Sequence, residues 1–276
     1  MKKQRCGFWC ILLMAVIIAI CAAMPVSYAA TISGTVYNED GTSPVNDTTI
    51  AVNLYEGTPC GPHQVVAQNT TSNGGFVIAG ISPGVYYLKT EKVFGTSNCV
   101  NEWWAGAGSI WDCWGAEAIT INSSADVLTD KNFQLDLYGS ISGSVYDANG
   151  IPMTESQILC VSAIRGSSCQ NSDNIDSFAM VGQPSYRIRK VPPGTYYVKS
   201  FNNSNSVWYV EEYHTVSGNT NNGISYLCSS ATQVTVNSGM DTPNIDFQLD
   251  GGGRISGTVF KSVSYTHLTL PTILLV

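Results

Sequence analysis

Hydrophobic and polar residues alternate along several short stretches of the chain, as expected for β-strands that bury one face. In ISGTVY, Ile32 and Val36 share one side of such a strand. In GVYYLK, Tyr86 and Leu88 share a side, and Lys89 falls on the other. No segment has the sustained 3.6-residue period of an amphipathic helix. The pattern therefore predicts an all-β protein.

The same phrases return in the same order along the chain. ISGTVY at 32–37 returns at 141–146 and 255–260, SPGVYYLKT at 82–90 returns at 192–200, and NFQLD at 132–136 returns at 246–250. The first phrase recurs after 109 residues (141 minus 32) and again after 114 (255 minus 141), which is the size of a domain. We predict domains at 31–138 and 139–253, followed by the first strand of a truncated third repeat at 254–262.

Turn residues separate the alternating stretches. Pro83-Gly84 and Pro193-Gly194 each precede the longest strand, where proline fixes φ and glycine accepts a positive φ. Each repeat of roughly 110 residues has room for about seven short strands, which indicates an antiparallel β-sandwich. The chain is thus expected to be a tandem array of sandwiches.

The phrases ISGTVYNEDG, GGFVIAGISPGVYYLKT and FQLD, in that order, resemble the bacterial carboxypeptidase regulatory-like domain, a transthyretin-like (prealbumin-like) β-sandwich. This resemblance covers nearly all of residues 31–252. The second repeat departs from it at Ser185-Tyr186-Arg187, where the usual glycine is missing. The resemblance implies tandem transthyretin-like sandwiches.

The first thirty residues have the organisation of a secretory signal peptide. An apolar run follows three basic residues and ends near Ser27 and Ala29, which fit a cleavage site. The run is shorter than the ~20 residues of a spanning helix, so cleavage is favoured over an uncleaved anchor. Lipidation at Cys21 is disfavoured because the bulky Ile20 precedes it. We expect a secreted protein, extracellular or in the cell envelope.

The last residues, 263–276, do not continue the repeat. Back-translation of VSYTHLTLPT resembles the transposon-end adapter used in sequencing libraries. We interpret this tail as non-native, which would make the chain a fragment of a longer protein. A variable native C-terminus is the alternative.

Charge and motifs exclude several classes of function. The chain has 13 basic and 20 acidic residues, and removal of the three basic residues of the signal peptide leaves 10 against 20. Nucleic acid and anionic membranes are therefore unexpected partners. His63 and His214 begin no zinc-binding motif, and the Ser-rich GSISGS is followed by a strand instead of a helix. We predict that the protein is not an enzyme and has no cofactor or metal.

Six cysteines follow the signal peptide, and an even number in an exported protein suggests disulfides. Alignment of the repeats makes Cys60 equivalent to Cys169 and Cys113 equivalent to Cys228. One bridge in each domain, Cys60 to Cys113 and Cys169 to Cys228, is the simplest pattern. It leaves Cys99 and Cys160, and a bridge from Cys60 to Cys99 remains an alternative.

An aromatic insert at 99–118 contains Trp103, Trp104, Trp111 and Trp114, and the second repeat has Trp208, Tyr209 and Tyr213 near the same position. These side chains are the candidate ligand-binding residues. Rings can stack on sugars, with hydrogen bonds to hydroxyl groups from Asn101, Glu102 and Asp112. Alternatively, the insert is a lid whose rings pack on the sandwich or on the next domain. We favour the lid because aromatic rings dominate burial in small domains.

The resulting hypothesis is a secreted, non-catalytic stalk, spacer or binding module of the cell surface. Its partner would be an extracellular polysaccharide or another surface protein, without membrane contact after signal cleavage. Two alternatives stay open: a carbohydrate-binding module that uses the tryptophan insert, and accessory domains of a secreted hydrolase. The fold does not decide among them.

Overall fold

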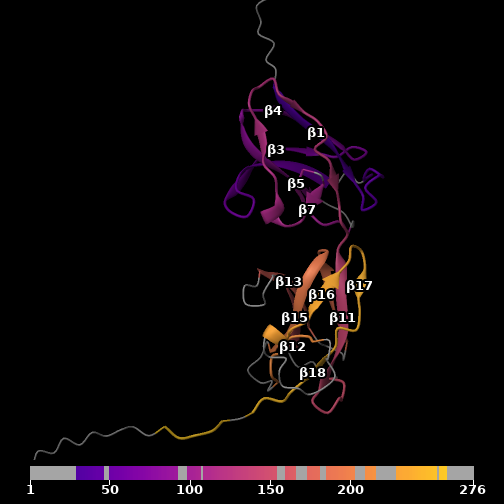
Figure 1. Ribbon diagram of the computed structural model, residues 1–276, viewed down its shortest axis with the longest axis vertical. Coiled ribbons are helices and arrows are strands. Elements are labelled where there is room, and N and C mark those ends of the chain that lie inside the picture. The colour runs from indigo at the N-terminus through magenta and orange to yellow at the C-terminus, as the bar shows by residue number, and fades with distance from the viewer. Residues whose placement is uncertain are drawn as a thin grey trace, which may run out of the picture.

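A computed structural model describes residues 29–46, 50–92, 98–106, 108–153, 159–165, 173–180, 185–202, 209–215, 228–253 and 255–259. These residues form two β-sandwich units, one above the other along the longest axis (Figure 1). The helices in the described part are two 3-10 turns, η1 (Cys113–Gly115) and η2 (Cys228–Ser230). The predicted all-β fold class is confirmed. The described residues include no helix with the length and apolarity needed to cross a membrane.

The first unit contains two sheets. One has the order β10-β1-β4, with β9 also on β1, and the other has the order β3-β2-β5-β6-β7, with β8 also on β5. Its strands are β1 (Ala30–Tyr37), β2 (Ile50–Gly57), β3 (His63–Thr70), β4 (Gly75–Ile81), β5 (Gly84–Lys92), β6 (Trp103–Trp104), β7 (Ser109–Ile110), β8 (Ile119–Ile121), β9 (Val127–Leu128) and β10 (Phe133–Gln134).

The second unit repeats this arrangement. Its sheets have the orders β14-β11-β17, with β18 also on β11, and β13-β12-β15-β16. The strands are β11 (Gly139–Asp147), β12 (Leu159–Arg165), β13 (Asp173–Met180), β14 (Ser185–Val191), β15 (Gly194–Asn202), β16 (Gln233–Val236), β17 (Asp241–Thr242) and β18 (Phe247–Leu249). Residues 255–259 lie outside the strands that the structure describes. Residues 1–28 of the predicted signal peptide and the tail at 263–276 lie outside the described residues, whereas Ala30 already belongs to β1.

Each unit has its own buried core. Ile32, Val36 and Leu88 are fully buried in the first core, and Ile141 and Val145 occupy the equivalent places in the second. These are the inward positions predicted from the alternation. Burial of such side chains supplies most of the stabilisation of each sandwich, at about 25 cal/mol for each Å² of apolar surface.

The repeated Pro-Gly corner is closed by the tyrosine that follows it. The hydroxyl of Tyr86 donates to the carbonyl oxygen of Ser82 at 3.0 Å, and that of Tyr196 donates to Pro192 at 2.6 Å. Gly194 has a φ of 151°, which favours glycine. The phrase P-G-x-Y is therefore repeated because its tyrosine packs in the core and also donates a hydrogen bond to a backbone carbonyl oxygen of the corner.

The glycine of the repeated phrase I-S-G is required by a close backbone approach. A Cβ atom on Gly34 would lie 2.3 Å from the carbonyl oxygen of Lys131, and one on Gly143 would lie 2.0 Å from that of Ile245. In each unit the segment that leads into the final strand crosses this point. No larger side chain fits unless that backbone moves.

We expect the Gly143→Ala substitution to lower the free energy of unfolding of the second unit by about 1 to 3 kcal/mol, as overpacking does. Chemical denaturation followed by circular dichroism measures the change. Gly253→Ala is the matched control, because a Cβ atom there has no neighbour within 4 Å. Equal midpoints for the two variants would contradict the interpretation.

Candidate functional site

The aromatic insert covers the outer face of the sheet formed by β2, β3 and β5. Within it, β6 pairs with β5 at Lys89 and Trp103, and β7 pairs back on β6. The chain then turns through η1 before it returns to the sandwich as β8. The insert thus extends the sheet and also projects beyond it.

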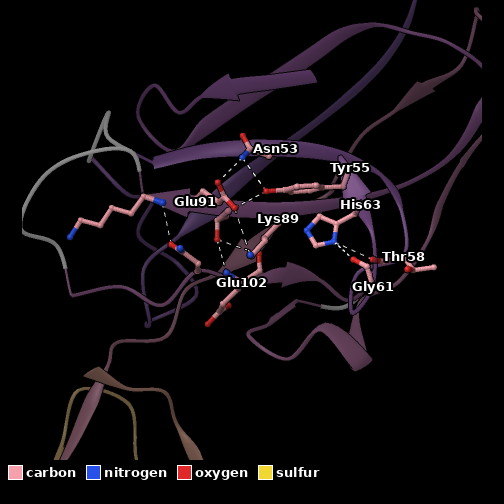
Figure 2. Close-up of polar contacts among 11 residues, drawn as sticks. Asn53, Tyr55, Thr58, Gly61, His63, Lys89, Glu91 and Glu102 are labelled. Carbon is pink, nitrogen blue, oxygen red and sulfur yellow. Dashed lines mark hydrogen bonds and ion pairs between the residues drawn. The ribbon is translucent and has the colours of Figure 1, made fainter. Parts of the chain in front are cut away.

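Trp103 lies inside an aromatic cluster on this outer face. Only 3% of its surface is exposed, and its ring centroid is 5.3 Å from that of Tyr55 and 5.6 Å from that of His63. The Nζ atom of Lys89 lies 5.0 Å from the same ring, within the range of a cation–π contact. His63 is oriented by its Nδ1 atom, 2.7 Å from the carbonyl oxygen of Gly61 (Figure 2).

A polar network lies next to this cluster. The hydroxyl of Tyr55 donates to Oε1 of Glu91 at 2.6 Å, and Nδ2 of Asn53 donates to Oε2 of Glu91 at 3.0 Å (Figure 2). Lys89 forms an ion pair with Glu91 at 3.6 Å. Burial, together with the Glu91 carboxylate, raises the pKa of Tyr55 to about 12. The phenol therefore stays protonated at neutral pH and serves as a hydrogen-bond donor.

Trp104 points the other way, into the first core. Its side chain is 7% exposed and belongs to the buried cluster of the first unit. Nζ of Lys131 lies 4.2 Å from the centre of its ring. The two adjacent tryptophans therefore pack on opposite faces of one sheet, as expected for neighbours on a strand.

Glu102, just before these rings, is completely buried. Its backbone N–H donates to Oγ1 of Thr90 at 2.9 Å, and its Oε1 accepts the backbone N–H of Asp136 at 3.0 Å. The hydroxyl of Ser109 lies against its Oε2 atom. Burial raises the pKa of Glu102 to about 7. Glu102 thus contacts β5 through its backbone N–H, and its carboxyl group joins the insert to the chain that leaves the sandwich.

The second unit contains the same arrangement around Glu212. The Glu212 backbone N–H donates to Oγ of Ser200 at 3.0 Å, and Oε1 of Glu212 accepts the backbone N–H of Asp250 at 3.1 Å. Sequence reasoning missed this role and treated Glu102 as a ligand for sugar hydroxyls. The signal was present, because Glu102 and Glu212 stand at the same distance after Thr90 and Ser200.

Trp111 and Asp112 leave the first unit and contact the second. The guanidinium of Arg165 lies 3.8 Å from the centre of the Trp111 ring, and its Nη2 atom is 2.8 Å from Oδ2 of Asp112. Nε1 of Trp111 donates to the carbonyl oxygen of Pro193 at 3.0 Å. These contacts form what we call the clamp: Trp111, Asp112, Arg165 and Pro193.

The linker between the units is held by both of them. On the side of the first unit, the Tyr138 N–H donates to the carbonyl oxygen of Asn98 at 2.8 Å. On the other side, the Leu137 N–H donates to Oγ of Ser238 at 2.8 Å. Gly139 is buried, and a Cβ atom on it would lie 2.6 Å from Cγ1 of Val236. The junction is thus fixed at the linker and, separately, at the clamp.

A disulfide joins Cys60, in the loop between β2 and β3, to Cys113 at the start of η1. This is the pairing expected for the first repeat, and it excludes the alternative bridge from Cys60 to Cys99. Cys160 is a buried thiol in β12. The second expected bridge cannot be followed, because Cys169 and the side chain of Cys228 lie outside the described residues.

The insert differs from the exposed sugar platform that was one of the two hypotheses. Trp103 and Trp104 are buried and Trp111 contacts the second unit, whereas Trp114 is 79% exposed. The proposed sugar ligands are also engaged within the chain: Oδ1 of Asn101 accepts the backbone N–H of Lys92, Glu102 is buried, and Asp112 binds Arg165. The rings and carboxylates of the insert therefore contact other parts of the chain, and Trp103 in particular packs on Tyr55 of the adjoining sheet.

In the second unit, two of the three candidate aromatic side chains are described. Tyr209 packs against the second core, and Tyr213 has Nζ of Lys199 5.5 Å from its ring centre. Tyr213 pairs with Lys199 as Trp103 pairs with Lys89, so this contact is a feature of both units. The side chain of Trp208 lies outside the described residues.

Two further features of the described surface hold polar or ligand-type side chains. Among the described residues, one set has the spacing of metal ligands, Cys60, Asp112 and Cys113, but its two sulfur atoms form the disulfide. An open depression of about 630 Å³ lies beside β1, β4 and the end of β3, lined mainly by hydroxyl and amide side chains and by the carboxylate of Asp130. Its lining contains no histidine or cysteine.

No protein-family model and no curated protein matches the chain. Among solved structures, it is similar to a streptococcal ancillary pilin, with 10% identity over 83% of this chain and 64% of that chain and a TM-score of 0.38. The TIE protein of Bacillus anthracis is similar with 11% identity over 80% of this chain and 34% of that chain, and a TM-score of 0.28. The pilus adhesin SpaC of Lactobacillus rhamnosus GG, in its open conformation, is similar with 10% identity over 82% of this chain and 32% of that chain, and a TM-score of 0.25. The chain spans less than two thirds of the length of each.

Proposed function

We propose that this chain is a secreted, non-catalytic spacer of the cell surface, in which two transthyretin-like sandwiches are held at a fixed angle. The observation that carries the proposal is the double attachment at the junction. A linker alone leaves rotation free, but the clamp adds a second contact that is distant in sequence from it. An array joined in this way keeps a partner at a defined distance and direction.

The chemistry of the insert supports the same function. Its rings and its buried carboxylate contact their own sheet, the core or the next unit. Aromatic side chains used in this way stabilise domains and interfaces by burial. The insert therefore builds the junction instead of forming a binding groove.

The test compares the orientations of the two units in solution. Residual dipolar couplings are fitted separately for each unit, and a fixed junction gives both units the same alignment tensor. Different tensors in the oxidised wild-type protein would contradict the proposed function.

We expect the Arg165→Ala substitution to make the two tensors diverge, because it removes the ion pair and the ring contact of the clamp together. Thermal unfolding of both units should change little, since the clamp lies outside both cores. Arg189→Ala, which removes an exposed arginine from β14, is the matched control and should keep a common tensor.

A second candidate function is polysaccharide binding, and it rests on Trp114, whose ring is 79% exposed. If this ring holds a sugar, Trp114→Ala will abolish retention on immobilised glycans while the melting temperature stays unchanged. If the Trp114→Ala variant were retained as well as the wild-type protein on the glycans that the wild-type protein binds, a sugar-binding role of Trp114 would be excluded. Burial gives Trp103 and Trp104 no equivalent role.

A further inference from the structure

We propose that the Cys60–Cys113 disulfide sets the angle between the two units, by holding the segment that carries Trp111 and Asp112 in place. The inference rests on the proposed spacer function and names the part of the first unit that controls it. Its basis is the position of the bridge relative to the clamp, together with the contacts of the segment itself.

The clamp and the disulfide occupy consecutive residues. Asp112 is the N-cap of η1, and its two carboxylate oxygens have different tasks: Oδ1 accepts the backbone N–H of Trp114 at 3.1 Å, and Oδ2 binds Arg165 at 2.8 Å. The next residue, Cys113, forms the bridge. A change in the position of Cys113 is therefore passed directly to the carboxylate that holds the second unit.

The hydrogen bonds that the structure describes for residues 112–116 within the first unit are internal to this turn. The backbone N–H of Gly115 donates to the carbonyl oxygen of Asp112 at 3.2 Å, and that of Ala116 donates to Cys113 at 3.3 Å. On either side, Ile110 pairs with Trp103, and the Glu117 N–H donates to Trp104 at 3.0 Å. The turn is thus anchored at its base, and the disulfide is the covalent attachment at its tip.

The other end of the bridge is firmly placed. Cys60 lies in the loop between β2 and β3, where the Thr58 N–H donates to the carbonyl oxygen of Pro62 at 3.2 Å and the Gly61 N–H donates to Thr58 at 3.0 Å. His63, at the end of this loop, packs its ring on Trp103. The loop follows β2 in the chain, and the first six residues of β2 are buried. The bridge therefore ties the clamp to a part of the unit that has its own support.

Neither cysteine belongs to the buried cluster of the first unit. Loss of the bridge therefore leaves the core contacts in place and frees the turn. Dithiothreitol would do so by transferring two electrons and two protons, which gives two thiols on the protein while the reagent closes to its cyclic disulfide. A secreted protein normally keeps such a bridge oxidised.

The test uses the full chain, oxidised and after dithiothreitol treatment, and the double variant Cys60→Ser with Cys113→Ser. Residual dipolar couplings report the angle between the units, and amide chemical shifts of core residues report folding. We expect one common alignment tensor for the oxidised protein, and two different tensors for the reduced protein and for the variant. Core shifts of both units should stay unchanged.

The outcomes separate the two proposals. Two different tensors in the oxidised wild-type protein would overturn the spacer function itself. A common tensor in both the reduced protein and the variant would leave the spacer intact and overturn the role of the disulfide. Loss of the first unit's core shifts in the reduced protein would also overturn it, because the bridge would then act on folding. Arg165→Ala, with the bridge present, should reproduce the divergence of the reduced protein.

Discussion

Replacement of Trp104 by alanine is expected to lower the free energy of unfolding of the first unit by about 3 to 5 kcal/mol, the usual loss for a large aromatic core residue. The side chain is 7% exposed and belongs to the first buried cluster. Its removal leaves a cavity between the sheets and also deletes the contact with Lys131. Few other single substitutions in the insert should cost as much.

Chemical denaturation followed by circular dichroism measures this loss, with the transition of the second unit as an internal reference. The matched control is Trp114→Ala, since an exposed ring outside any network should change stability by no more than about 0.5 kcal/mol. If the two variants had equal midpoints, Trp104 would not be a core residue and the insert would not be a lid. Tryptophan fluorescence is unsuitable here because the substitution removes part of the signal.

The repeated strands could be predicted from the sequence because each depends on local alternation. Inward positions such as Ile32 and Leu88 are buried, and the Pro-Gly corners precede β5 and β15. The short strands were harder to foresee. Segments of two or three residues, such as β9 (Val127–Leu128), have no period to detect and exist because they lie beside β1.

The junction could not be predicted in the same way. Asp112 and Arg165 form an ion pair although they are distant in the sequence. The repeats do not reveal the pair, because the residue of the first unit that aligns with Arg165 is the acidic Glu56. The sequence leaves Asn101, Glu102 and Asp112 open to a role in a sugar platform or in a packed lid, since composition alone does not distinguish a buried carboxyl group from an exposed one. Glu102 is buried because β5, β7 and the start of the linker each supply a hydrogen-bond partner for it.

The burial of Glu102 has a consequence for pH dependence. Its pKa is about 7 in the folded protein, against an ordinary value of 4.5, and the main cause is loss of hydration. Below pH 4.5 the group is protonated in both the folded and the unfolded states. Between 4.5 and about 7 only the folded state retains the proton, so a rise in pH favours unfolding. Above about 7 the folded state also carries the charge, and the lost stabilisation reaches its full value of about 3 kcal/mol.

The Glu102→Gln substitution is therefore expected to raise the stability of the first unit above pH 7 by up to about 3 kcal/mol, and to change it little below pH 4.5. The amide can still accept the backbone N–H of Asp136, and its NH₂ group can donate to Ser109. The pH at which the two proteins diverge identifies the group, because other titrations affect both equally.

Denaturation midpoints of both proteins between pH 4 and 9 measure this difference, and Glu117→Gln, an exposed carboxylate, is the control. The control should follow the wild-type protein at every pH. If Glu102→Gln were destabilising above pH 7, the carboxylate would be the form that the fold prefers, and its two partners, the Ser109 hydroxyl and the Asp136 N–H, would then bind a charge. Because these two partners connect Glu102 to the insert and to the start of the linker, ionisation of Glu102 should also weaken the attachment of the insert before the core of the first unit unfolds.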